Sequence, residues 1–210
     1  MRVLILGASQ GTGALACRLL LERGHDVTAF ARSPQKLVLE HPKLTRRVGD
    51  FHDEASVKEA VPGHDAVIIT ASATNMGAFK EEPLYFSKGT GYAISAMKGA
   101  AVRRLVVLSA FGAGESRRAS GVVLKLLMAL LLEAPYADHD RQEALVRDSG
   151  LDWVIARPTR LTNGPARKRY EKKTAIEPVP NAISRADVAD FLVEATTTDT
   201  WLRQCVQLGG

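Results

Sequence analysis

The fold of this chain is decided by one stretch near its beginning, Arg2-Val3-Leu4-Ile5-Leu6-Gly7-Ala8-Ser9-Gln10-Gly11-Thr12-Gly13. It starts as an apolar run typical of a buried parallel strand, continues into a glycine-rich turn, and leads into a helical pattern over residues 14–23. A strand, a tight turn and a helix in succession are what a dinucleotide-binding fold uses to hold a pyrophosphate. We therefore predict an anion site formed by Gly7, Ser9, Gln10, Gly11, Thr12 and Gly13.

The spacing of these glycines, Gly-x-x-x-Gly-x-Gly, differs from the Gly-x-Gly-x-x-Gly of two-domain dehydrogenases. Glycine lets the backbone turn sharply and approach a phosphate without a Cβ clash, while the helix start offers free N–H groups. An ordinary strand-to-helix turn would also contain glycine. The position of this turn at the start of a βαβ pattern favours the phosphate site.

Length and composition predict a single α/β domain over residues 1–210, because 46% hydrophobic content is enough for one large core. We expect a Rossmann-like, doubly wound, mainly parallel sheet between two helix layers. Met1-Arg2 leads directly into the first strand without a signal pattern, so a cytoplasmic location is expected. Cys17 and Cys205 lie on elements expected to be buried and need no disulfide.

The net charge of +5 raises the question of nucleic acid binding. The basic residues are scattered except in the segment 167–173, which we interpret as a solvated loop. No helix-turn-helix, zinc or aromatic stacking pattern accompanies it, so neither nucleic acid nor a metal is expected. An excess of positive charge also favours a phosphorylated cofactor.

The residues that follow the second predicted strand, over residues 25–30, indicate which dinucleotide the chain prefers. NAD-binding sites carry an acidic residue roughly 20 residues past the glycines, where it accepts from the ribose 2′-hydroxyl. This chain has Arg32 there, with Ser33 and Lys36 close by. A guanidinium pairs with a 2′-phosphate, so NADP(H) is favoured over NAD(H). The alternative is a surface arginine at the start of a short helix.

The next two strands contribute to the same edge of the sheet. After the third strand, over residues 44–48, Asp50 is placed to accept from the adenine amino group and Phe51 to pack on the ring, although Asp50 also suits a simple turn. The fourth strand, over residues 65–70, ends in small residues that leave room for a ribose and nicotinamide. These are Ala71, Ser72 and Ala73.

The fifth and sixth strands, over residues 104–109 and 151–156, end where chemistry occurs in open α/β sheets. Ser109 could orient a carbonyl or the nicotinamide carboxamide there, or cap the following turn. The loop over residues 157–165, which includes Pro158, is expected to cover the nicotinamide end.

The stretch 121–132 is the most apolar in the chain. Lys125 interrupts it, and it is shorter than the ~20 apolar residues of a membrane span, so a buried or interface helix is favoured. It suits a substrate wall or a dimer surface, and we expect a monomer or a homodimer. We interpret residues 112–135 and 160–182 as insertions on the substrate side.

The remaining elements are expected to complete the sheet and its helices. An amphipathic helix is predicted over residues 138–149, and Ser184 is predicted to cap the last helix with Asp187 three residues on. A final edge strand is predicted over residues 204–208. The side chains of the first of these helices that are expected to face inward are Ala144, Leu145 and Val146.

Four motifs in this order resemble the atypical short-chain dehydrogenase/reductases. The resemblance is narrowest to their NAD(P)H-binding subgroup, which includes NmrA-like proteins and the small flavin and biliverdin reductases. It implies a Rossmann fold that binds NADP(H), with hydride transfer as the commonest chemistry. The motifs are Gly7–Gly13, Gly49-Asp50, Ser149–Pro158 and Ile183–Ala189.

The chain departs from this resemblance at its catalytic positions. Typical short-chain dehydrogenases use Tyr-x-x-x-Lys, in which lysine lowers the pKa of the tyrosine that exchanges a proton. No tyrosine here is followed by lysine at that spacing. In the small flavin reductases a serine and a histidine lie near the nicotinamide. Ser109 and Arg160 stand about where they would be, and His139 falls where related proteins often carry lysine.

We therefore expect an NADPH-dependent reductase that passes hydride to a flavin, a quinone or a similar conjugated acceptor. Such a ring can take its proton from water, so a missing tyrosine acid matters less than for a ketone. Ser109 would orient the nicotinamide or acceptor, and Arg160 or His139 would stabilise developing negative charge. The alternatives are a non-catalytic NADP(H)-binding redox sensor and, disfavoured by the absent tyrosine–lysine pair, a nucleotide-sugar epimerase or dehydratase.

Overall fold

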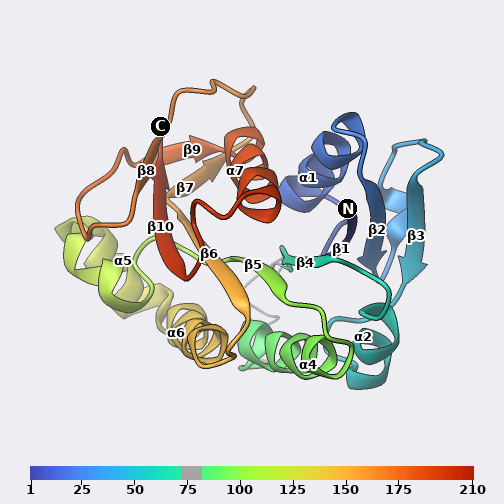
Figure 1. The fold of residues 1–210 in the computed structure, drawn as a ribbon. Helices are drawn as coiled ribbons and strands as arrows, with labels where there is room; N and C mark the ends of the chain where they lie inside the picture. The colour runs from blue at the N-terminus through green and yellow to red at the C-terminus, as the bar shows by residue number, and fades with distance from the viewer. Residues whose placement is uncertain (72–81) are drawn as a thin grey trace.

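A computed structural model describes residues 1–71 and 82–210 of the chain. Its centre is an eight-stranded sheet, shown in Figure 1, in the order β3-β2-β1-β4-β5-β6-β10-β8. Every neighbouring pair in this sheet is parallel except β10 and β8. In sheet order the strands are Leu44–Val48, Asp26–Ala31, Arg2–Leu6, Ala66–Ile69, Arg104–Leu108, Asp152–Pro158, Gln204–Gly209 and Glu171–Lys173.

Strand β1 lies at the point where the strand order reverses. Val3 pairs with Val27 of β2 on one side and with Ala66 of β4 on the other. In open α/β sheets, ligands bind beyond the carboxyl ends of the strands at this switch point. The glycine-rich turn that follows β1 therefore lies at the carboxyl edge of the sheet, at the switch point.

Helices cover both faces of the sheet (Figure 1). One face packs on α1 (Gly11–Glu22) and α7 (Arg185–Thr197), and the other on α2 (Glu54–Ala60), α4 (Tyr85–Gly99) and α6 (Glu133–Arg147). Helix α5 spans Val122–Leu131, short 3₁₀ turns span Pro34–Lys36 (η1) and Gly114–Ala119 (η2), and a separate two-stranded sheet joins β7 (Arg160–Thr162) to β9 (Ala182–Ser184).

Alternation along β1 explains the two cores. Val3 and Ile5 belong to the cluster formed with α1 and α7, whereas Leu4 and Leu6 belong to the cluster on the other face. Successive side chains of a strand point to opposite faces, so a strand covered on both faces must be apolar throughout. The three-layer α/β architecture predicted from the sequence is confirmed.

Several boundaries differ from the sequence prediction. Strand β6 continues through Pro158, so the loop expected from residue 157 begins later. The last strand, β10, is not an edge strand, because β8 pairs with it in antiparallel fashion. Residues 171–173 lie between two loop segments, and nothing in their local pattern indicated that pairing.

Helix α6 begins at Glu133 rather than at residue 138, with Pro135 in its first turn. Proline is tolerated there because the first helical N–H groups have no intrahelical acceptor. Val146 is buried as expected, but Ala144 is exposed and Leu145 is 43% exposed, so two of the three side chains predicted to face inward do not. The buried face of the helix is largely polar, and it carries Asp138, His139, Gln142 and Glu143.

Helix α5 coincides with the apolar stretch, but its described side chains are not buried within the chain. Val122, Leu126 and Leu130 are 82%, 59% and 70% exposed. These residues recur every four positions and therefore form one stripe along the helix. Among the described residues, no helix has the length and apolar character that crossing a membrane requires.

Candidate functional site

The turn after β1 has a backbone that only glycine accommodates at two positions. Gly7 adopts φ +99°, and a Cβ placed on it would lie 2.6 Å from the amide nitrogen of Ala71. A Cβ on Gly13 would lie 2.4 Å from the carbonyl oxygen of Gly7, so this glycine lets α1 pack close to β1. At both positions, contacts with the chain's own backbone require glycine. The outer side of the turn therefore stays accessible to a ligand.

Helix α1 begins at Gly11, with Gln10 as its N-cap residue. In the described part of the chain, no side chain caps this end. The first N–H groups of a helix have no intrahelical acceptor, and they lie at the positive end of the helix dipole. This is an arrangement that binds phosphate.

Hydrogen bonds attach the turn to the end of β2. The amides of Gly7 and Ala8 donate to the carbonyl oxygen of Phe30 at 3.0 and 3.2 Å. Because Arg32 lies two residues beyond Phe30, these bonds hold the glycine turn next to the predicted 2′-phosphate residues.

One cavity connects these features. It brings together most of the residues predicted to bind cofactor along β1, β2, β3 and β4. It is lined by Gly7, Ser9, Gln10, Phe30, Ala31, Arg32, Ser33, Lys36, Gly49, Asp50, Phe51, His52, Ala71 and Tyr85. Gly11, Thr12 and Gly13 form the helix start behind it, and Ser72 and Ala73 lie outside the described residues.

The far end of the cavity carries positive charge. Arg32 and Lys36 are exposed, and Ser33 is the N-cap residue of the short turn η1. Within the described residues, neither cation has a carboxylate at ion-pair distance. Cations that pair with no carboxylate among the described residues are suited to a phosphate. The residues present therefore fit an anionic dinucleotide.

The opposite wall differs in part from the expectation. Asp50 accepts a hydrogen bond from the amide of His52 at 2.9 Å, as a turn residue does, and its side chain remains 44% exposed. Phe51 is only 7% exposed, and a Cβ on Gly89 would lie 2.4 Å from its ring. Phe51 therefore lines the cavity but packs mainly in the core.

Two aromatic residues of this wall were not found from the sequence. The rings of His52 and Tyr85 meet edge to face, with centroids 4.4 Å apart. His52 Nε2 lies 2.8 Å from the carbonyl oxygen of Tyr85, and burial raises the pKa of the Tyr85 hydroxyl. Tyr85 opens a helix far from residue 52 in the sequence, so only the packing of α4 against α2, the helix that follows His52, brings the pair together.

The Ser109 side chain is buried at the carboxyl end of β5, and its hydroxyl donates to Glu143 Oε1 at 2.7 Å. The backbone beyond it follows β6, because Ser109 N donates to Ala156 O and Phe111 N to Pro158 O. Pro158, the last residue of β6, is buried at this edge. A hydroxyl that donates one bond keeps lone pairs that can accept another.

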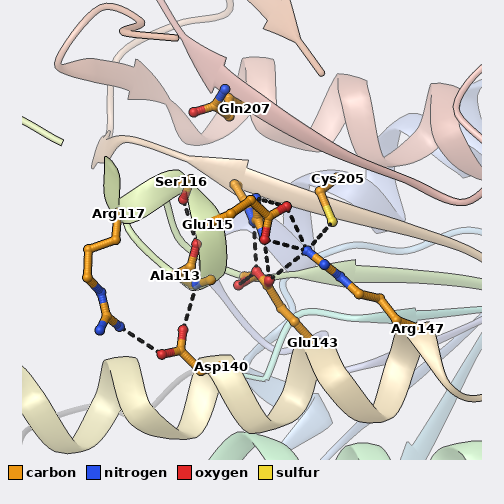
Figure 2. Close-up of polar contacts among 12 residues, drawn as sticks. Ala113, Glu115, Ser116, Arg117, Asp140, Glu143, Arg147, Cys205 and Gln207 are labelled. Carbon is orange, nitrogen blue, oxygen red and sulfur yellow. Dashed lines mark hydrogen bonds and ion pairs between the residues drawn. The ribbon is translucent and has the colours of Figure 1, made fainter. Parts of the chain in front are cut away.

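Glu143 belongs to a buried charge cluster (Figure 2). Arg157, 2% exposed in its side chain, donates from Nε to Glu143 Oε1 at 2.9 Å and from Nη2 to Oε2 at 2.5 Å. The same guanidinium donates from Nη1 and Nη2 to Glu115 at 3.1 and 3.0 Å. Arg147 donates to both Glu115 oxygens at 2.8 Å and to Cys205 Sγ at 3.2 Å.

The cluster holds two guanidinium groups and two carboxylates, so its charges balance. Burial alone would raise the pKa of Glu115, but hydrogen bonds from Arg157 and Arg147 outweigh this and lower it to about 2. Burial works against the charge of Arg157, but hydrogen bonds to Glu143 and Glu115 raise its pKa. These contacts fasten η2 and α6 to the end of β6.

The other two predicted catalytic residues lie on α6 and β7. His139 is 8% exposed, stacks on Phe86 with centroids 4.0 Å apart, and bonds Gln142 through Nδ1 at 3.0 Å. Burial lowers the pKa of this histidine, which favours the neutral ring. Arg160 is exposed on β7 in the small second sheet. The structure thus gives His139 a packing position between α4 and α6.

The model of a protein family described as NAD(P)H-binding matches residues 7–199. A 3-beta-hydroxysteroid dehydrogenase of Mycolicibacterium neoaurum is 44% identical over 75 residues, which are 36% of this chain and 20% of the relative. A 2-alkyl-3-oxoalkanoate reductase of Stenotrophomonas maltophilia is 35% identical over 112 residues, or 52% and 33% of the two chains. The matches thus span about a third or less of these relatives.

Solved structures match over the whole chain. An anaerobillin reductase, ChuY, of Escherichia coli O157:H7 has a TM-score of 0.82 at 20% identity, covering 100% of this chain and 97% of the other. A short-chain dehydrogenase/reductase of Veillonella parvula in complex with NADP has a TM-score of 0.82 at 20% identity, covering 100% and 94%. At 20% identity, these similarities show that the fold is shared and nothing more.

Proposed function

Because the chain belongs to the NAD(P)H-binding family, we propose that it is an NADPH-dependent reductase that passes hydride to a conjugated ring acceptor such as a flavin, a quinone or a tetrapyrrole. The family match confirms the resemblance drawn from the sequence motifs. The observation that carries the proposal is the cavity that joins the glycine turn to Arg32, Ser33 and Lys36. We retain one domain, with residues 112–135 and 160–182 on the substrate side, as part of the proposal.

We choose a conjugated ring as the acceptor because Tyr136 of α6 is not part of a Tyr-x-x-x-Lys pair that would donate a proton. Tyr136 is followed four positions later by Asp140, and its hydroxyl donates to the carbonyl oxygen of Phe111 at 3.0 Å. Asp140 accepts from the amide of Gly114 at 2.6 Å and pairs with Arg117 at 2.8 Å. The position four residues after this tyrosine thus holds an aspartate and not the lysine that lowers the tyrosine pKa in a Tyr-x-x-x-Lys pair. A conjugated ring suits such a site because it can take its proton from water.

Bound NADPH supplies the hydride, and the chain's own residues hold and orient the reactants. Ser109 keeps acceptor capacity while it donates to Glu143, so it suits the carboxamide N–H of the nicotinamide. Arg160 is an exposed cation that could stabilise negative charge on the acceptor. His139 is left out of the proposed site because its ring is buried against Phe86.

Turnover is tested by mixing the purified protein with NADPH and a panel of flavins, quinones and linear tetrapyrroles. Absorbance at the reduced nicotinamide band should fall faster than in protein-free controls with at least one acceptor. NADPH binding without faster oxidation across the panel would favour the second candidate, a redox sensor. Two observations favour the redox sensor. Ser109 already donates its hydroxyl hydrogen to Glu143, and the sequence has no tyrosine–lysine pair at the Tyr-x-x-x-Lys spacing.

Cofactor preference is tested by Arg32→Asp. Loss of the guanidinium should cost about 1–3 kcal/mol of NADPH binding free energy if it pairs with the 2′-phosphate, and much less for NADH. Titration calorimetry with both nucleotides measures the difference. Arg18→Asp, an equal charge change at an exposed position of α1, is the control. Equal losses for NADPH and NADH in Arg32→Asp would contradict the assignment.

A further inference from the structure

The glycine turn has a second neighbour, Arg185, which lies in the motif Ile183–Ala189 but was given no role from the sequence. A Cβ placed on Gly11 would lie 3.7 Å from Nε and 3.8 Å from Cδ of Arg185. Arg185 is the first residue of α7, and Gly11 is the first residue of α1. The two helices pack on the same face of the sheet (Figure 1), so their N-terminal ends bring this guanidinium beside the turn.

The position of Arg185 is held from both sides. Its Nη1 donates to Asn163 Oδ1 at 2.7 Å. Behind it, Ser184 and Asp187 cap α7, because the amide of Asp187 donates to Ser184 Oγ at 3.0 Å. Asp187 also accepts from the amides of Arg167 and Lys168, each at 2.9 Å. The start of α7 is therefore already occupied by its own chain.

The charge of Arg185 is not neutralised by the described part of the protein. The side chain of Asn163, to which it donates, is a neutral amide, and among residues 1–71 and 82–210 no carboxylate lies at ion-pair distance. A guanidinium has five N–H donors, so the contact with Asn163 leaves others available. Arg32, by contrast, lies at the cavity end that we assign to the 2′-phosphate.

We propose that Arg185 is a cofactor-binding residue that pairs with the pyrophosphate of the dinucleotide, opposite the free amides of the α1 start. This inference rests on the proposed function, since it requires a dinucleotide in the glycine turn. A pyrophosphate carries negative charge on both of its phosphates, so one helix terminus and one cation complement it well. NADH and NADPH share this group, which separates the role of Arg185 from that of Arg32.

The test is titration calorimetry of NADPH and NADH with wild type and Arg185→Gln. Because charge-assisted hydrogen bonds are the strong ones, Arg185→Gln should weaken both nucleotides by the same factor, about tenfold or more. The loss should shrink as salt is added, because salt screens the pair. Arg18→Gln is the matched charge control on α1, and it should bind both nucleotides like wild type.

Asn163→Ala removes the hydrogen bond between Asn163 and Arg185 but keeps the guanidinium. It therefore distinguishes the loss of the Arg185 charge from the loss of this contact. It should reduce affinity much less than Arg185→Gln. If Arg185→Gln does not fold, as judged by circular dichroism, Arg185→Lys replaces it and should weaken both nucleotides by a smaller factor.

Three results would overturn the inference while wild type binds nucleotide. These are unchanged affinity in the Arg185 variant, a loss confined to NADPH, and an equal loss in Asn163→Ala. If wild type bound neither nucleotide, the proposed function itself would fail.

Discussion

Arg157 shows most clearly how one residue depends on its partners. Its guanidinium is almost fully buried and is compensated by two carboxylates, one deeply buried and one partly exposed. Glu143 is 3% exposed in its side chain, whereas Glu115 is 34% exposed. A buried charge that loses its main partner costs far more than a surface pair, because its desolvation is no longer offset. The two carboxylates should therefore differ in importance.

Glu143→Ala should lower the free energy of unfolding by about 3–5 kcal/mol, because it leaves Arg157 without its closest partner and Ser109 without its acceptor. Glu115→Ala should cost about 1–2 kcal/mol, because Arg157 keeps Glu143. Urea unfolding followed by circular dichroism measures both. A Glu143→Ala cost no larger than that of Glu115→Ala would show that the buried pair contributes little.

At the scale of elements, the packing of α4 against α6 was the contact that could least be predicted from the sequence. The contact is made by polar groups, since Asp138 accepts from the amide of Phe86 at 2.5 Å and Gln142 donates to Thr90 at 2.9 Å. A helix whose inner face carries Asp, His, Gln and Glu does not show a hydrophobic period. The amphipathic pattern therefore pointed to Ala144 and Leu145, both of which are exposed.

Two glycines of α4 give a matched pair of substitutions. Alanine is favoured over glycine in a helix by about 0.5–1 kcal/mol, and a Cβ on Gly91 would meet open space, so Gly91→Ala should be stabilising by that amount. At Gly89 the Cβ would lie 2.4 Å from the buried Phe51 ring, so Gly89→Ala should be destabilising by about 1–3 kcal/mol. Thermal unfolding compares them. Changes of the same sign would contradict the packing of Phe51 against α4.

At the scale of the whole molecule, acid stability follows from carboxylates whose pKa values are lowered by folding. Hydrogen bonds from the Arg2 amide and from Arg103 lower the pKa values of Asp65 and Asp152. The pKa of Glu115 falls from 4.5 to about 2. A lowered carboxyl pKa adds stability above the unfolded value, and this is lost as pH falls toward the folded value.

Glu115→Gln isolates one part of this dependence. The wild type should be more stable than the variant at pH 6 by about 1 kcal/mol, a modest value because the side chain is partly exposed and screened by solvent. This difference should shrink as pH is lowered from 4.5 to 2, the range bounded by the two pKa values. Unfolding titrations at several pH values provide the measurement. A difference that stays constant with pH would show that the Glu115 pKa is not lowered.

The sequence by itself determined the parts that depend on local chemistry. Apolar runs that end in glycine or small residues predicted the parallel strands, and the glycine turn predicted a dinucleotide-binding family, because backbone freedom is a property of the residues themselves. The preference for a 2′-phosphate at Arg32 stays a prediction. The capping of α7 by Ser184 was predicted in the same way and is observed.

Only the tertiary structure decided which distant residues meet. It placed Tyr85 beside His52, Arg185 beside Gly11, β8 beside β10, and Arg157 between Glu143 and Glu115. Each of these contacts joins segments that local patterns describe separately. Their partners are chosen by helix packing and strand order, which involve the whole chain, and buried polar groups leave no periodic signal in the sequence.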